Sequence, residues 1–157
     1  MQFDTYWILL SFLTGVFSTL VMTIFEIPFW KKWNLTGVLE WHENQALIIR
    51  ILKLPDNIIH FWGIFLLHFI NGGLGGIGFL MVLIFIPSLH LIPILILALL
   101  YGFFLWIITL IPIHKPITGL NPWRHPLGHG PAIVSLLGHL IYCSVLSILF
   151  SITFVKF

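Results

Sequence analysis

The stretch His68–Leu100, HFINGGLGGIGFLMVLIFIPSLHLIPILILALL, decides the class of the fold. It contains no aspartate, glutamate, lysine or arginine, and the short sequence PSLH (Pro87–His90) interrupts it. A helix needs about 20 mostly apolar residues to cross a hydrocarbon core about 30 Å thick. The stretch therefore predicts two membrane-spanning helices joined in a tight antiparallel hairpin.

The whole chain follows the same pattern. Of its 157 residues 59% are hydrophobic and 8% are charged, whereas soluble domains carry about 25% charged residues. Apolar runs predict four spans, at about 6–30, 58–86, 91–113 and 131–155. We therefore expect an all-α integral membrane four-helix bundle, a single transmembrane domain over residues 1–157 in contact with lipid. The formal net charge of +2 gives no reason to expect nucleic acid as a partner.

The residues between the first two runs predict a different kind of helix, over about 38–54. In VLEWHENQALIIRILKL, helical spacing places Trp41 and Ile48 on one side and Glu43 and Arg50 on the other. Such a helix is typical of the membrane interface, where it lies in the plane of the bilayer. The alternative is a loop helix that packs under the bundle.

Basic residues predict the orientation. Six of the seven lysines and arginines fall in the two long loops after the first and third runs. The positive-inside rule then predicts a multi-pass protein of the cell membrane with both long loops in the cytoplasm and both termini outside. The six residues are Lys31, Lys32, Arg50, Lys53, Lys115 and Arg124.

Four ionisable residues lie in the predicted spans, where such groups usually face the interior of a bundle. A rise of 1.5 Å per residue places His68 and His139 roughly 12–15 Å below the same membrane face. By the same rise Glu26 lies about 6 Å from that face, and His60 is at a similar depth.

This placement allows three roles for the four side chains. His68 and His139 at one depth could ligate a haem iron or a copper ion. Glu26 and His60 could form a buried pair or a proton relay. Alternatively, all four side chains only form hydrogen bonds between helices and hold the bundle together.

The segment Asn71–Gly76 predicts a close helix contact. Gly72 and Gly76 form a GxxxG pair, and small residues let another backbone approach closely in lipid. We expect the partner to be another helix of the same chain, with Asn71 beside the contact.

The second long loop contains His114, His125 and His129, which together could hold copper or zinc. The alternative is an ordered loop that packs on a partner protein. The single cysteine, Cys143, excludes an internal disulfide and a cysteine-based zinc site. No Ser-His-Asp, CxxC, HExxH or phosphate-loop pattern is present, so we expect the chain not to be catalytic itself.

Four segments, "GVFSTLVMTIF", "HFINGGLGG", "YGFFLWIITLIPIHKP" and "GHLIYC", resemble the YagU-like family of small four-helix membrane proteins. The resemblance covers most of the chain and implies the architecture, with His68 and His139 as the positions that match the family's histidine motifs. Cys143 stands where the family pattern has glycine.

The isoleucine- and phenylalanine-rich composition resembles that of membrane proteins from ammonia-oxidising archaea. This resemblance implies an accessory subunit of the copper-dependent archaeal ammonia monooxygenase. We therefore expect a non-catalytic, structural subunit that packs on other integral membrane subunits and needs no cofactor of its own. The alternatives are a haem- or metal-binding electron-transfer protein and a small transporter or proton-conducting protein.

Overall fold

The computed structural model describes residues 4–85 and 91–154. These residues form helices and loops without a β-strand. Four helices are long and apolar enough to cross a membrane, which confirms the predicted class. They are α1 (Thr5–Trp33), α3 (Phe61–Ile84), α4 (Leu91–Ile108) and α6 (Gly130–Phe154). The predicted turn Pro87–His90 lies outside the described residues.

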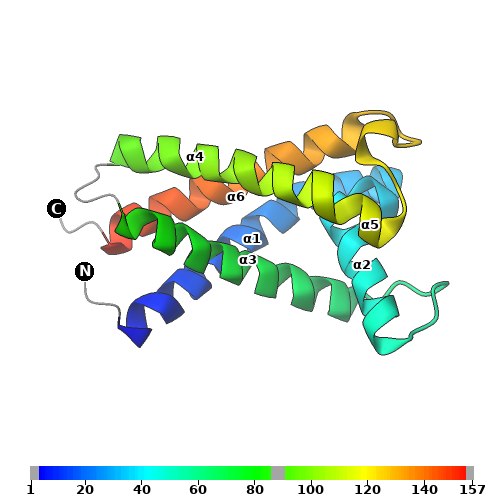
Figure 1. Ribbon diagram of the computed structural model, residues 1–157, viewed down its shortest axis with the longest axis horizontal. Coiled ribbons are helices and arrows are strands. Elements are labelled where there is room, and N and C mark those ends of the chain that lie inside the picture. The colour runs from blue at the N-terminus through cyan, green and yellow to red at the C-terminus, as the bar shows by residue number, and fades with distance from the viewer. Residues whose placement is uncertain (1–3, 86–90, 155–157) are drawn as a thin grey trace.

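The four long helices run along the longest axis of the molecule, and α1 begins at the end where α6 finishes (Figure 1). The opposite end holds the short elements α2 (Leu39–Leu52) and α5 (Lys115–Thr118) (Figure 1). Two short 3₁₀ turns, η1 (Leu35–Gly37) and η3 (Pro122–Arg124), belong to the loops there. Polar groups are therefore concentrated at one end of an otherwise apolar bundle.

Helices α1 and α3 approach each other through glycines. A Cβ on Gly72 would collide with Oγ1 of Thr19, and a Cβ on Gly76 would collide with the carbonyl oxygen of Ser11. The glycine of α1 is also too close to α3 for a side chain, because a Cβ on Gly15 would collide with the carbonyl oxygen of Gly72. The GxxxG pair thus lies against α1 of the same chain, in the manner of close helix contacts in lipid.

The other helices pack unevenly. α1 packs along α6 as well as α3, and α4 packs along α6. Among the described residues, one contact between α4 and α3 is Tyr101, whose ring is tilted by 40° against that of Phe79 and whose hydroxyl donates a hydrogen bond of 2.9 Å to the Gly75 carbonyl. The bundle is therefore open between α3 and α4 on the side of Tyr101 that faces α2.

Helix α4 ends in a π-helical turn, η2 (Thr109–His114), which continues into α5. Pro112 lies inside this turn, and proline removes a backbone donor and clashes with the preceding turn, so it disrupts regular α-helix. As a result the helical path extends to Thr118, beyond the predicted end at residue 113, and His114 is fully buried.

Helix α2 is amphipathic, as predicted, but the assignment of Glu43 to an outward polar face was wrong. Glu40, Glu43 and Asn44 are buried against the bundle, while Ile51 and Leu52 are 67% and 62% exposed. α2 packs on α3, α5 and α6. Its carboxyl groups turn inward because they meet polar partners there, and Ile51 and Leu52 form an exposed apolar edge.

Candidate functional site

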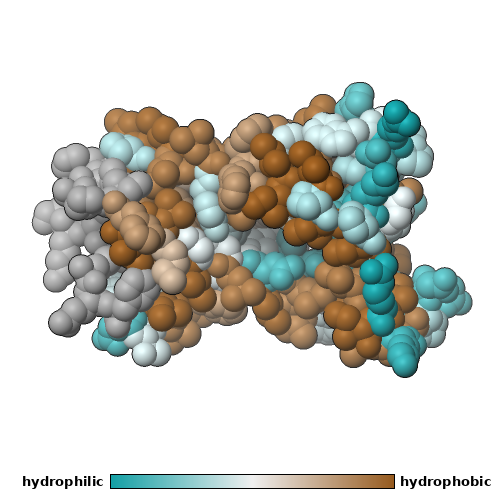
Figure 2. Space-filling model, viewed as in Figure 1, coloured by the Kyte–Doolittle hydropathy of each residue, from teal (hydrophilic) through white to brown (hydrophobic). Residues whose placement is uncertain are grey.

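A cleft of about 340 Å³ lies between α3 and α4, and α2 closes one end of it. Figure 2 shows this face hollowed between two largely hydrophobic ridges, with hydrophilic side chains at the hollow. Cavities of this size hold small ligands or the head of a larger one. The lining residues are Thr19, Met22, Glu40, Glu43, Asn44, His68, Asn71, Gly72, Leu74, Gly75, Tyr101, Leu105, Thr109, His139 and Tyr142.

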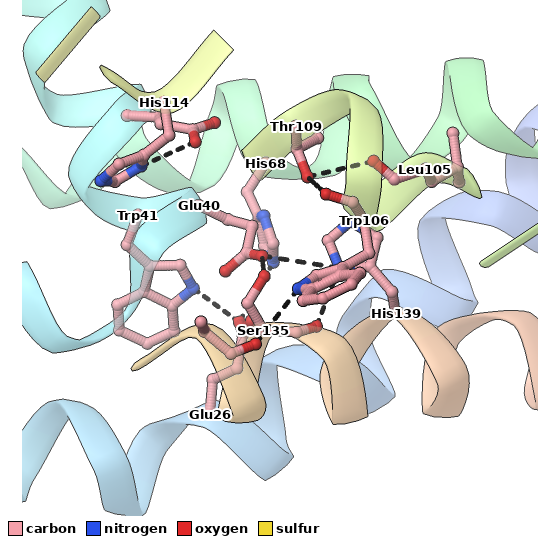
Figure 3. Close-up of polar contacts among 12 residues, drawn as sticks. Glu26, Glu40, Trp41, His68, Leu105, Trp106, Thr109, His114, Ser135 and His139 are labelled. Carbon is pink, nitrogen blue, oxygen red and sulfur yellow. Dashed lines mark hydrogen bonds and ion pairs between the residues drawn. The ribbon is translucent and has the colours of Figure 1, made fainter. Parts of the chain in front are cut away.

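Glu26 lies behind the cleft and is fully buried. Its Oε2 accepts a hydrogen bond of 2.7 Å from the indole Nε1 of Trp41 and lies 3.5 Å from Nε2 of His68 (Figure 3). A carboxylate in this environment is costly without partners. The α1 carboxyl is therefore held from two sides, by α2 and α3.

Glu40 forms a second pair at the floor of the cleft (Figure 3). Its Oε1 accepts a hydrogen bond from the Ser135 hydroxyl and lies 3.5 Å from Nδ1 of His139. That Nδ1 also lies 2.9 Å from the carbonyl oxygen of Ser135. Since a carbonyl only accepts, Nδ1 of His139 carries a hydrogen, and in the tautomer with that single hydrogen Nε2 is an acceptor.

Glu43 forms the third pair, with His114 at 2.8 Å between Oε1 and Nδ1. Burial, and then repulsion from Glu40, raise the pKa of Glu43 to about 9. This carboxyl is therefore neutral at pH 7 and can donate its hydroxyl hydrogen to the imidazole. The pair links α2 to the π-helical turn without a net charge.

Two further histidines surround this pair. The ring of His42 lies edge-on to that of His114, with centroids 5.8 Å apart. Burial, and then the nearby rings of His114 and His125, lower the pKa of His42 to about 4. Burial also lowers the pKa of His125. Both rings are neutral at pH 7, so this end of the molecule holds a cluster of uncharged imidazoles.

Several buried polar atoms of the site have no hydrogen-bond partner in the described residues. They include Oε1 of Glu26, Oε2 of Glu40 and Nε2 of His68. Unsatisfied buried groups are rare in native proteins and often mark a place for a missing molecule. The site therefore has an unfilled capacity for hydrogen bonds at the junction of α1, α2 and α3.

The structure places the predicted site residues as follows. His68 and His139 line one cleft, as the matched depth suggests, but each pairs with a different glutamate. His60 does not contact Glu26; its backbone N–H donates to Oε1 of Gln45 at 2.9 Å. Asn71 reaches Oδ1 of Asn44 at 3.5 Å.

The three loop histidines occupy different surroundings. His114 is bound to Glu43, Nδ1 of His125 accepts from the Leu127 amide at 3.1 Å, and His129 is exposed. Within the described ranges no three His, Cys, Asp or Glu side chains are arranged to hold a metal ion. A metal at these histidines stays a prediction from the sequence.

The site also contains Glu40, Trp41 and Ser135, which the sequence alone does not identify. Their partners lie 15 to 95 positions away along the chain, so no local pattern reveals them. The available signal was the concentration of polar residues in "EWHENQ" (residues 40–45), between apolar spans.

Comparison of the chain with protein-family models, with curated proteins and with solved structures finds no match. The site therefore has to be interpreted from its own geometry.

Proposed function

We propose that this protein binds a lipophilic small molecule that enters from the bilayer through the cleft between α3 and α4. Its polar group would lie among Glu40, His68 and His139, and its apolar part would extend toward the lipid. The observation that carries the proposal is a cleft with an ionisable lining, set between two helices long and apolar enough to span a membrane.

The lining supports this function because polar groups inside a membrane protein are costly and are usually retained for a task. Nε2 of His139 is left as an acceptor, and Glu40 has one oxygen without a partner. Histidine exchanges protons near neutral pH. The proposal therefore includes proton exchange between the ligand and these residues, which is close to the transporter or proton-conducting alternative from the sequence.

Photo-crosslinking tests the proposal. We expect a fatty alcohol that carries a diazirine to label the cleft-facing residues of α3 and α4 in the protein purified in lipid nanodiscs. Leu105→Trp, which fills the cleft, should abolish most of this labelling. Leu100→Trp is the matched control, because Leu100 lies on the same helix and is 62% exposed. Labelling spread over all exposed residues, unchanged by Leu105→Trp, would contradict the proposal.

The accessory-subunit function stays a second proposal, including assembly with archaeal ammonia monooxygenase. Apolar side chains such as Phe103, Phe104 and Ile111 are exposed on the α4–η2 surface, and a partner subunit could cover them as lipid does. Migration only as a free monomer in gentle-detergent native electrophoresis would contradict it. Haem or copper at His68 and His139 likewise stays a prediction, which an absorption spectrum and elemental analysis of the purified protein test.

A further inference from the structure

The unpartnered atoms of the site indicate which chemical group is missing. Glu40 is 9% exposed and lines the cleft, and its Oε2 has no hydrogen-bond partner. Oε1 of Glu26 is also unpartnered, but Glu26 is fully buried and does not line the cleft. A carboxylate oxygen accepts hydrogen bonds and donates none. The group that completes this site is therefore a hydrogen-bond donor.

The charges around the cleft specify the donor further. No lysine or arginine is among the lining residues, whereas Glu40 lines the cleft and has one oxygen without a partner. An anionic head, such as a phosphate or a carboxylate, would add an acceptor to a site that already has unpaired acceptors and would find no fixed cation. A cationic donor would offset the acidic charge, and a buried charge is tolerated only when it is paired.

The remainder of the lining suits an alkyl chain. Met22, Leu74 and Leu105 present apolar side chains to the cleft. The hydroxyl groups of Tyr101 and Tyr142 are engaged with carbonyls of α3, at 2.9 and 2.6 Å, so their rings contribute chiefly apolar surface. Aromatic faces also attract cations.

We propose that the ligand of the cleft is a lipophilic primary amine, bound as the ammonium ion with an N–H donor at Oε2 of Glu40. Its alkyl chain leaves the molecule between α3 and α4. This inference rests on the proposed function and narrows it, because it requires both lateral entry and a donor head.

Competition against the neutral diazirine alcohol tests the ligand class in the full-length protein in nanodiscs of zwitterionic lipid. The competitors are octylamine, octyltrimethylammonium and octanoate, which share the chain and differ in the head. We expect octylamine to displace the probe from the cleft at a concentration at least about tenfold lower than the trimethyl analogue, which has no N–H donor. Octanoate should not displace it.

The variant Glu40→Gln should remove the preference for octylamine. Asp56→Asn is the control, because Asp56 is an exposed carboxyl away from the cleft. If Glu40→Gln does not fold, the preference among the three competitors in the unmodified protein still decides the outcome. Equal displacement by all three would overturn the amine assignment and leave the cleft as a ligand site. Absence of probe labelling in the cleft would overturn both proposals.

Discussion

Glu43 keeps its proton at neutral pH, and this makes the stability of the protein depend on pH. Its pKa is about 9 in the folded chain and 4.5 as the reference for an unperturbed group. Because the folded pKa is raised, this group contributes its full stabilisation below pH 4.5, and the contribution is lost as pH rises through about 9. The buried acid would have to ionise next to Glu40, or the helix end would have to open.

We therefore expect Glu43→Gln to flatten the pH dependence of thermal unfolding in detergent. The neutral amide preserves a donor for His114 and has no proton to lose. Relative to Glu43→Gln, the unmodified protein should lose at least about 2–4 °C in Tm between pH 5 and pH 9, roughly the effect of 1 kcal/mol for a chain of this size. Asp56→Asn should leave the pH slope unchanged. Parallel slopes for Glu43→Gln and the unmodified protein would contradict the assignment.

His42 gives the stability of the protein the opposite pH dependence, at acidic pH. Its pKa falls from 6.5 to about 4 on folding, so its stabilising contribution is present above pH 6.5 and is lost as pH falls toward 4. The polar end of the molecule is therefore destabilised in both directions, by protonation of the imidazoles and by ionisation of Glu43. This is the consequence of a histidine cluster that is buried in its neutral form.

At the scale of elements, the close contact of α1 and α3 depends on Gly72. We expect Gly72→Val to destabilise the protein by about 1–3 kcal/mol, the usual cost of overpacking, because its side chain would collide with Thr19. The measurement is thermal unfolding in detergent. Leu66→Val introduces the same residue at a lipid-facing position of the same helix, where the present side chain is 63% exposed, and should change Tm little. Similar effects of the two substitutions would show that the glycine contact is dispensable.

The elements differ in how well the sequence predicts them. The four spans follow from length and hydropathy alone, because no other structure satisfies the backbone of such long apolar segments in lipid. The face that α2 buries cannot be predicted in this way, since the charged residues of an amphipathic helix usually face water. Here Glu40 and Glu43 turn inward because Ser135, His139 and His114 offer partners, and these contacts depend on tertiary structure.

Some features of the site can be predicted from the sequence, and others depend on how the helices pack. His68 and His139 were found from depth along their helices, which is a one-dimensional property of the sequence. Their pairing with Glu26 and Glu40 depends on the rotation of each helix about its axis. Packing sets that rotation, and the apolar runs are too uniform to reveal it.

For the whole molecule, the distribution of basic residues predicts the orientation in the membrane. All six lysines and arginines of the long loops lie at the end with α2 and α5, while α1 begins and α6 finishes at the other (Figure 1). The positive-inside rule places the α2 end in the cytoplasm. The His–Glu pairs at the α2 end of the cleft would then be closer to the cytoplasmic face.

Cysteine labelling of intact cells tests this orientation. We expect a membrane-impermeant maleimide to leave Asp56→Cys unmodified until the cells are opened, and to modify Tyr6→Cys, which is 59% exposed at the start of α1, from outside. The unmodified protein is the control, because Cys143 is fully buried. The reverse pattern would place the α2 end outside. The cleft would then lie nearer the external medium, so the result also decides from which compartment water-soluble reagents reach this end of the cleft.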